Sequence, residues 1–401
     1  MRLMQIDTFL IRILYLFAAG IVCSTVLGFE SVSSALFGMT FFLVVLLWLS
    51  GTIRKVTWTD AILILTIGLS LGNLIINASL EETAISFAYF KKYVMFIMTL
   101  VYFQAACKLR IDDRTEKFLL FINSSIAVFF VIMYALNSPT LYMIGSRISN
   151  YLTFGFTNPN LTALFLMCIY TGELIQVFQG KSVFRKLWHL ALAAAVCWFV
   201  WETESRNCLM TIMAETILCI ILYLTRNGFR LPKWFSLLIS VWPILFVAVY
   251  MMVMENARLQ ELFSFMVSEG KGLDARMSVW APALRAYSAS PIWGAYSQIS
   301  RGTGMSQLHN THLDILASYG TVILILVCYL LYGMIRSKST RNLKEDTMVR
   351  ICFCGTIIMG MGEAALFSGG LGIYLFAGMF LLLCNRERNQ PSEASVGESG
   401  L

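Results

Sequence analysis

The sequence is poor in charge and in the residues that make polar surfaces. Of its 401 residues, 13% are charged and three are histidine, while 58% are hydrophobic. A soluble domain carries roughly 25% charged residues, because much of its surface must face water. The scarcity of charge therefore excludes a soluble globular protein and predicts helices within a lipid bilayer.

Cysteine patterns typical of disulfide frameworks or zinc sites are also missing. The ten cysteines are scattered, mostly within apolar segments, and show no paired zinc-ligand spacing. We expect them to be small apolar packing residues. The first apolar segment, at about 9–27, lacks a small-x-small cleavage site, so we predict a retained helix rather than a signal peptide.

Apolar segments of helix length recur along the chain and predict an all-α, polytopic membrane protein with about twelve transmembrane helices. They lie at 9–27, 33–50, 59–77, 90–107, 118–136, 160–178, 187–203, 207–225, 234–254, 311–335, 349–367 and 371–385. Residues 1–385 form a single integral membrane domain in this prediction. Residues 386–401 form a polar, disordered tail.

The net charge of +7 is a signal of membrane topology. Twenty of the 30 basic residues fall in one set of short connections, and nine fall in the other set. Short cytoplasmic loops carry the excess of Lys and Arg. Both termini are therefore predicted to be cytoplasmic, and nothing in the charge distribution calls for a nucleic-acid partner.

One outer connection is long and is predicted to carry function. It runs from about residue 255 to 308, between the ninth and tenth spans, and loops of that length are usually functional. Within it, Arg276, Trp280 and Tyr287 recur at helical spacing over 275–289. Trp and Tyr favour the headgroup level, so we expect this helix to be interfacial.

Polar clusters at 153–160, 202–207 and 308–314 share the outer side of this topology. Charges between apolar spans are costly to bury unless they are paired or face water. We therefore predict a solvated pocket lined by Arg206, Arg276 and His309. Arginine presents a planar set of donors that suits phosphate oxygens, and histidine can accept a proton from a hydroxyl near neutral pH.

This combination suits a lipid-linked pyrophosphate donor attacked by a hydroxyl acceptor. Pyrophosphate is a good leaving group once its charge is stabilised, so we expect no metal and no other cofactor.

Plainer roles stay open for the arginines. Arg206 can pair with Glu202 or Glu204 and close a helix hairpin. Arg276 and Arg285 can be solvated charges on an interfacial helix.

The histidines also have alternative interpretations. His309 can simply begin a helix, and His309, His312 and Asp314 together can bind a metal ion. His189 lies at the cytoplasmic end of a span and is expected at the membrane interface.

The ordered motifs of the second half of the chain resemble a known superfamily. They are Ser205-Arg206, Asp274-Ala-Arg276-x-x-x-Trp280-x-x-Ala-Leu284, Ser290-Pro291-Ile-Trp-Gly294, His309-Asn310 followed by Gly320, and more weakly Asn158-Pro159-Asn160. Their order and spacing over residues 150–325 resemble the O-antigen ligase and O-antigen or capsular polysaccharide polymerase superfamily.

This resemblance implies glycosyl transfer at the outer face of the bacterial cytoplasmic membrane, from a glycan linked to undecaprenyl pyrophosphate. It implies that Arg206 and Arg276 bind the pyrophosphate and that His309 acts on the acceptor hydroxyl. Further candidate substrate-binding residues are Asn310, Arg285 and Asn158. Besides membrane lipid, the candidate partners are a flippase and a chain-length regulator.

Within this superfamily the sequence favours a polymerase. The ligase branch often has a second Gly three residues after the first, where this chain has Ile323. A ligase that transfers glycan to another acceptor stays open, as do a flippase or transporter and a structural scaffold. Transporters usually place ionisable groups near the bilayer midplane. Here the middle regions of the spans are almost free of charge, apart from Arg12, Glu173, Glu215 and Glu363 near or within the span limits.

Overall fold

The computed structural model describes residues 2–80, 87–137, 142–144, 150–156, 158–225, 228–262, 274–295, 308–363 and 373–386. The predicted tail lies outside these residues, except for Arg386. Two stretches of the long outer loop, 263–273 and 296–307, lie outside them as well.

The structure confirms an all-α protein with helices suited to a membrane. Among the described residues, eight helices are long and apolar enough to cross a bilayer. They are α1 (Arg2–Val26), α2 (Glu30–Arg54), α3 (Trp58–Leu80), α5 (Asp113–Ala135), α6 (Pro159–Gln179), α7 (Val183–Glu202), α8 (Arg206–Leu224) and α9 (Lys233–Glu255).

Further helices complete the bundle or cover its ends. They are α4 (Phe87–Ala106), α10 (Ala257–Leu262), α11 (Asp274–Ala289), α13 (Thr311–Tyr319), α14 (Thr321–Ile335), α15 (Leu343–Met359) and α17 (Ile373–Cys384). A short antiparallel pair, β1 (Tyr142–Ile144) and β2 (Asn150–Leu152), precedes α6 and was not predicted.

The core lies where α6 and α17 cross the middle of the bundle. Both helices are buried on all sides, and the Phe165 and Phe376 rings meet edge to face at 5.0 Å. Helices α2, α7 and α9 instead leave large apolar side chains exposed, including Phe42, Trp198 and Met252. Exposed apolar surface of this kind suits contact with lipid.

The tenth predicted segment differs from the prediction, because it is not one helix. It breaks at Gly320, whose φ is +89°, and continues as α13 and then α14. A left-handed backbone of this kind favours glycine. The last segment, α17, is also short, with 12 described residues.

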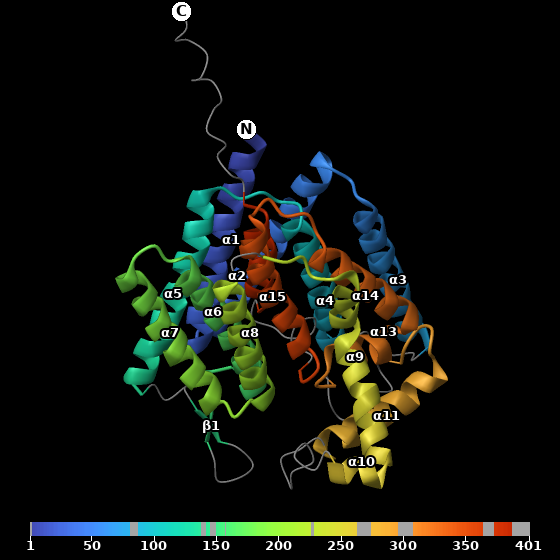
Figure 1. The fold of residues 1–401 in the computed structure, drawn as a ribbon. Coiled ribbons are helices and arrows are strands. Elements are labelled where there is room, and N and C mark those ends of the chain that lie inside the picture. Colours follow the sequence, from blue (N-terminus) through green and yellow to red (C-terminus); the bar gives the residue numbers. More distant parts are fainter. Residues whose placement is uncertain are drawn as a thin grey trace, which may run out of the picture.

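The two ends of the bundle differ in character (Figure 1). At the basic end, where α1 and α5 begin, ion pairs join the helices, among them Arg12–Asp112 and Lys108–Asp60. At the opposite end, the site end, α8 begins, and α10, α11 and β1 lie beyond the long helices.

Candidate functional site

The centre of the candidate site is the segment that follows α15, from Gly360 to Glu363. Helix α8 approaches it so closely that a Cβ on Gly362 would collide with the Asn207 side chain. From α9, the indole nitrogen of Trp242 lies 3.3 Å from the Met361 sulfur. Helices that are far apart in sequence therefore meet at this turn.

The start of α13 is fastened to the same turn. Thr311 donates its backbone N–H to the Gly360 carbonyl at 2.7 Å, and its hydroxyl donates to the Glu363 carbonyl at 2.9 Å. Asn310 caps α13 by accepting from the Leu313 N–H at 2.8 Å. Its amide nitrogen donates to the carbonyls of Pro243, at 2.8 Å, and Met361, at 3.0 Å.

His309 immediately precedes this cap and faces the Glu363 carboxylate. Its Nδ1 lies 3.2 Å from each carboxylate oxygen of Glu363, and the Glu363 side chain is 1% exposed. The imidazole itself is 30% exposed. When Nδ1 carries the proton, Glu363 accepts a hydrogen bond from Nδ1–H, and Nε2 is left as an unprotonated acceptor. Backbone strain accompanies this position, since His309 has a φ of +52°.

Arg276 reaches the turn from α11. Its Nη2 donates to the Gly362 carbonyl at 3.2 Å. Helix α11 is held in place by Trp280, which is fully buried. The Trp280 indole N–H donates to the Leu308 carbonyl at 2.7 Å, and its ring packs edge to face on Tyr250. The helix predicted at 275–289 is thus present, but its tryptophan packs inside the protein and not toward headgroups.

The charges of His309, Arg276 and Glu363 interact with one another. The hydrogen bond to Glu363 raises the pKa of His309 above its ordinary 6.5, while burial and the Arg276 charge oppose this shift. Burial lowers the pKa of Arg276, and the Glu363 charge counteracts the effect. A guanidinium nevertheless stays protonated. The site therefore combines a fixed cation, a buried carboxylate and a titrating imidazole.

Arg206 lies at the edge of this group. It is the first residue of α8 and is exposed, next to the Asn207 that contacts Gly362. One turn further, the Thr211 hydroxyl donates to the Met359 sulfur at 3.4 Å. The structure therefore places the α8 N-terminus against the same turn that Arg276 and His309 contact.

The other candidate substrate-binding residues have different surroundings. Asn310 is fully buried and serves the α13 cap. Asn158 caps α6 by accepting from the Asn160 N–H at 2.8 Å. Arg285 is exposed on α11, nine residues or about two and a half turns from Arg276, and so on the opposite face. Among the described residues, no hydrogen bond or ion pair joins Asn158 or Arg285 to the turn.

Sequence reasoning missed Glu363 as a member of the site. Glu363 falls within the predicted span 349–367. In the structure α15 ends at Met359, and the Glu363 carboxylate lies beyond the end of this helix. A carboxylate within an apolar segment is itself a signal of function. This signal could have identified Glu363 from the sequence.

The metal alternative for His312 and Asp314 finds no support among the described residues, where no group of three potential ligands lies together. His312 Nε2 donates to the Ser240 carbonyl at 2.7 Å. Asp314 pairs with Lys92 of α4 at 2.8 Å, and both side chains are buried. Lys92, near the start of the predicted span 90–107, therefore lies in the packed interior.

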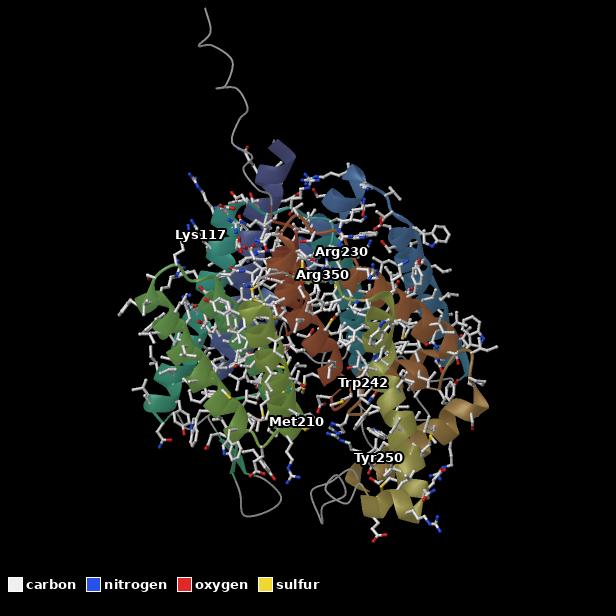
Figure 2. The ribbon with its side chains drawn as sticks, in the orientation of Figure 1. Lys117, Met210, Arg230, Trp242, Tyr250 and Arg350 are labelled. Atoms are coloured by element: carbon white, nitrogen blue, oxygen red, sulfur yellow. The ribbon has the colours of Figure 1, made fainter. Side chains whose placement is uncertain are left out.

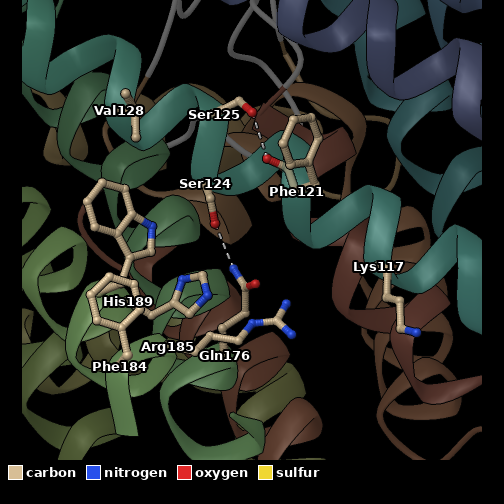
Figure 3. A pocket seen from close by; sticks show the side chains of 10 residues that line it. Lys117, Phe121, Ser124, Ser125, Val128, Gln176, Phe184, Arg185 and His189 are labelled. Atoms are coloured by element: carbon tan, nitrogen blue, oxygen red, sulfur yellow. Dashed lines mark hydrogen bonds between the residues drawn. The ribbon is translucent and has the colours of Figure 1, made fainter. Parts of the chain in front are cut away.

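A second polar cluster lies nearer the basic end, and His189 faces the protein interior within it. His189 is buried, with Nδ1 2.7 Å from Glu173, and the same carboxylate accepts from Asn123 and Ser124 at 2.8 Å. A cavity of about 450 Å³ lies beside it (Figure 3), where Gln176 donates to the Ser124 hydroxyl. The ionisable groups within the spans are therefore more embedded than the sequence suggested.

No protein-family model matches the chain, and no curated protein matches it in sequence. Function must therefore be argued from the chemistry of the residues.

Proposed function

We propose that the protein is a membrane glycosyltransferase that joins glycan repeat units carried on a polyprenyl pyrophosphate, and so acts as a glycan polymerase. One observation carries the proposal: the His309 imidazole is held by the buried Glu363 carboxylate, beside the Arg276 guanidinium. A base and an anion-binding group are the two components that this transfer requires.

The chemical step follows from this arrangement. A hydroxyl oxygen of the acceptor attacks the anomeric carbon of the donor sugar, and the bond from that carbon to the pyrophosphate oxygen breaks. The hydroxyl proton passes to His309 Nε2. The electron pair leaves with the lipid pyrophosphate, whose charge the Arg276 guanidinium stabilises, together with Arg206 at the rim.

Glu363 acts through His309. Its carboxylate accepts a hydrogen bond from Nδ1–H, which leaves Nε2 free to take the hydroxyl proton, and its charge stabilises the imidazolium that forms as the sugar hydroxyl is deprotonated. Burial strengthens this effect, because charges interact more strongly away from water.

The membrane arrangement completes the proposal. We take the apolar helices to form about twelve spans, with the basic end of the bundle in the cytoplasm and the site end at the outer face of a bacterial cytoplasmic membrane. The uneven distribution of basic residues supports this orientation. The donor lipid would then reach the site from the outer leaflet.

The proposal is tested with the full chain in proteoliposomes that contain lipid-linked repeat units. Wild-type protein and Arg258→Gln, a change of an exposed arginine on α10, should both form polymer. His309→Ala and Arg276→Gln should leave single repeats. Wild-type polymer from either of these two variants would contradict the assignment.

Deletion of the gene separates the polymerase from a ligase. Loss of a polymerase leaves single repeats on the final acceptor, whereas loss of a ligase leaves long chains on the lipid carrier. Polymer formation by the purified protein, with donor and acceptor both in the outer leaflet, distinguishes either enzyme from a flippase.

A further inference from the structure

A basic cavity lies at the basic end of the bundle, far from the residues proposed to act on glycan. It measures about 570 Å³ and lies between the segment before α9, the α14–α15 connection and α15. We infer that this cavity binds a phosphate-bearing anion with two or more negative charges, such as a diphosphate or the headgroup of an anionic lipid.

The charge of the lining is the first argument. Five cationic side chains line the cavity with one carboxylate, Asp346. The cations are Arg230, Arg336, Lys338, Arg341 and Arg350. Like charges that converge in a cavity repel one another, and the repulsion is relieved when an anion binds.

The two innermost cations are already compensated. Arg350 pairs with Asp346 at 2.8 Å, and its guanidinium also donates to the carbonyls of Ile335 and Ser337. Arg341 pairs with Glu116 and has a side chain that is 1% exposed. These two arginines are fixed parts of the wall and do not account for the excess charge.

The excess positive charge of the cavity comes from its three outer cations. Arg230, Arg336 and Lys338 are exposed, and within the described part of the chain no ion pair to a carboxylate is found for any of them. Arg336 donates to the neutral Leu231 carbonyl at 3.0 Å. Figure 2 labels Arg230 and Arg350 in this region of the bundle.

The loop that carries Lys338 is held in place before any ligand arrives. Ser339 donates to the Cys384 carbonyl at 2.7 Å, and the Thr340 N–H donates to the same carbonyl at 3.3 Å. The α14–α15 connection is thereby fastened to the end of α17. A preformed wall reduces the ordering cost of binding.

The opposite wall is fastened in the same manner. The Thr347 hydroxyl donates to the Phe229 carbonyl at 2.5 Å. Gly228 packs directly on the backbone of Lys344, where a Cβ would collide. The backbone next to Arg230 is therefore fixed against α15.

The charge and shape of the lining indicate which class of ligand the cavity binds. Three cations that have no carboxylate partner among the described residues suit a ligand with at least two negative charges, and guanidinium groups match phosphate oxygens. Basic pockets between membrane helices commonly receive the headgroups of anionic lipids, but a soluble diphosphate carries the same chemistry.

The test compares two double variants of the full-length protein that lose the same charge. Arg230→Gln with Lys338→Gln alters the cavity. The matched control is Arg114→Gln with Lys181→Gln, which changes two exposed basic residues outside its lining. Both double variants keep Arg206 and Arg276, so any binding at the glycan site is common to them.

Melting temperature is measured in detergent against inorganic pyrophosphate at constant ionic strength, and in nanodiscs of phosphatidylcholine with or without phosphatidylglycerol. We expect pyrophosphate, phosphatidylglycerol or both to stabilise the wild type and the control. The cavity variant should need at least tenfold more anion for the same shift. A response to pyrophosphate identifies a soluble source, and a response to the lipid alone identifies a headgroup. Absence of both responses, or equal responses of the two double variants, would overturn the inference.

Discussion

Replacing Glu363 with glutamine tests the proposed site most directly, because the change keeps the size of the side chain and removes its charge. A net hydrogen bond to a charged group is worth about 1.5–3 kcal/mol. If Glu363 stabilises the imidazolium at the transition state, its loss should slow turnover by roughly 10- to 100-fold, since about 1.4 kcal/mol corresponds to tenfold in rate. His309→Ala removes the base itself and should cost about 10²- to 10⁴-fold.

The pH dependence of Glu363→Gln provides a second readout. His309 must be neutral to accept a proton, and Glu363 raises its pKa above 6.5. The wild-type rate should therefore fall as the pH drops through that raised pKa. In Glu363→Gln the pKa falls, so the acid limb of the profile should move to lower pH. A merely structural role for Glu363 would lower the rate without moving this limb.

The measurement is the initial rate of polymer formation by purified protein in proteoliposomes from about pH 5 to 9. Glu255→Gln, at the exposed end of α9 on the same side of the bundle, is the matched control and should keep the wild-type profile. A Glu363→Gln protein with the wild-type rate and an unmoved acid limb would refute the reasoning.

Further outcomes follow from neighbouring contacts. Arg276→Lys keeps the charge but loses the planar donors, so polymer formation should fall about tenfold or more, while Arg258→Lys should not change it. Asn310→Ala removes a helix cap and a donor to two carbonyls, and should destabilise the fold by about 2–4 kcal/mol in denaturation assays. Lys92→Met should cost about 3–5 kcal/mol because it strands Asp314, and Asp314→Leu in the same chain should recover most of that loss. Failure of the second change to rescue the first would exclude the pair as the cause.

Hydropathy predicted most of the fold because lipid imposes a simple constraint. A helix that spans a bilayer must be apolar over its whole length, and the sequence shows this directly. The predicted start at residue 311 and the observed start of α13 at Thr311 coincide, and the predicted helix at 275–289 differs from α11 by one residue. Such boundaries are local properties of the sequence.

The missed features are long-range contacts. Lys92 and Asp314 are 222 residues apart in sequence, so no local pattern links them. Glu363 was missed because one carboxylate hardly changes the mean hydropathy of a span-length window that is otherwise apolar. The contact between His189 and Glu173 likewise joins two different helices, so no local pattern predicts it.

Two motifs that are separate in sequence form one structural unit around Gly320. The backbone of Ile292 approaches Gly320 so closely that a Cβ there would collide with the Ile292 carbonyl. A Cβ on Gly294, whose φ is +74°, would collide with the Ser318 backbone. The Ala295 N–H donates to the Ala317 carbonyl at 2.7 Å. Segment 290–295 therefore wraps the junction of α13 and α14.

This junction directs the N-terminus of α13 toward the turn at Glu363, so a change at Gly320 should disturb the site from a distance. Gly320→Ala adds a Cβ where φ is +89° and where backbone occupies the space. Both effects destabilise, and we expect a lowered melting temperature and reduced yield of folded protein. Gly333→Ala in α14 is the matched control, because its Cβ would meet only the Thr59 methyl at an ordinary 3.4 Å, and it should melt near the wild type. Equal melting temperatures for the two variants would show that the close approach at Gly320 does not hold α13 in place.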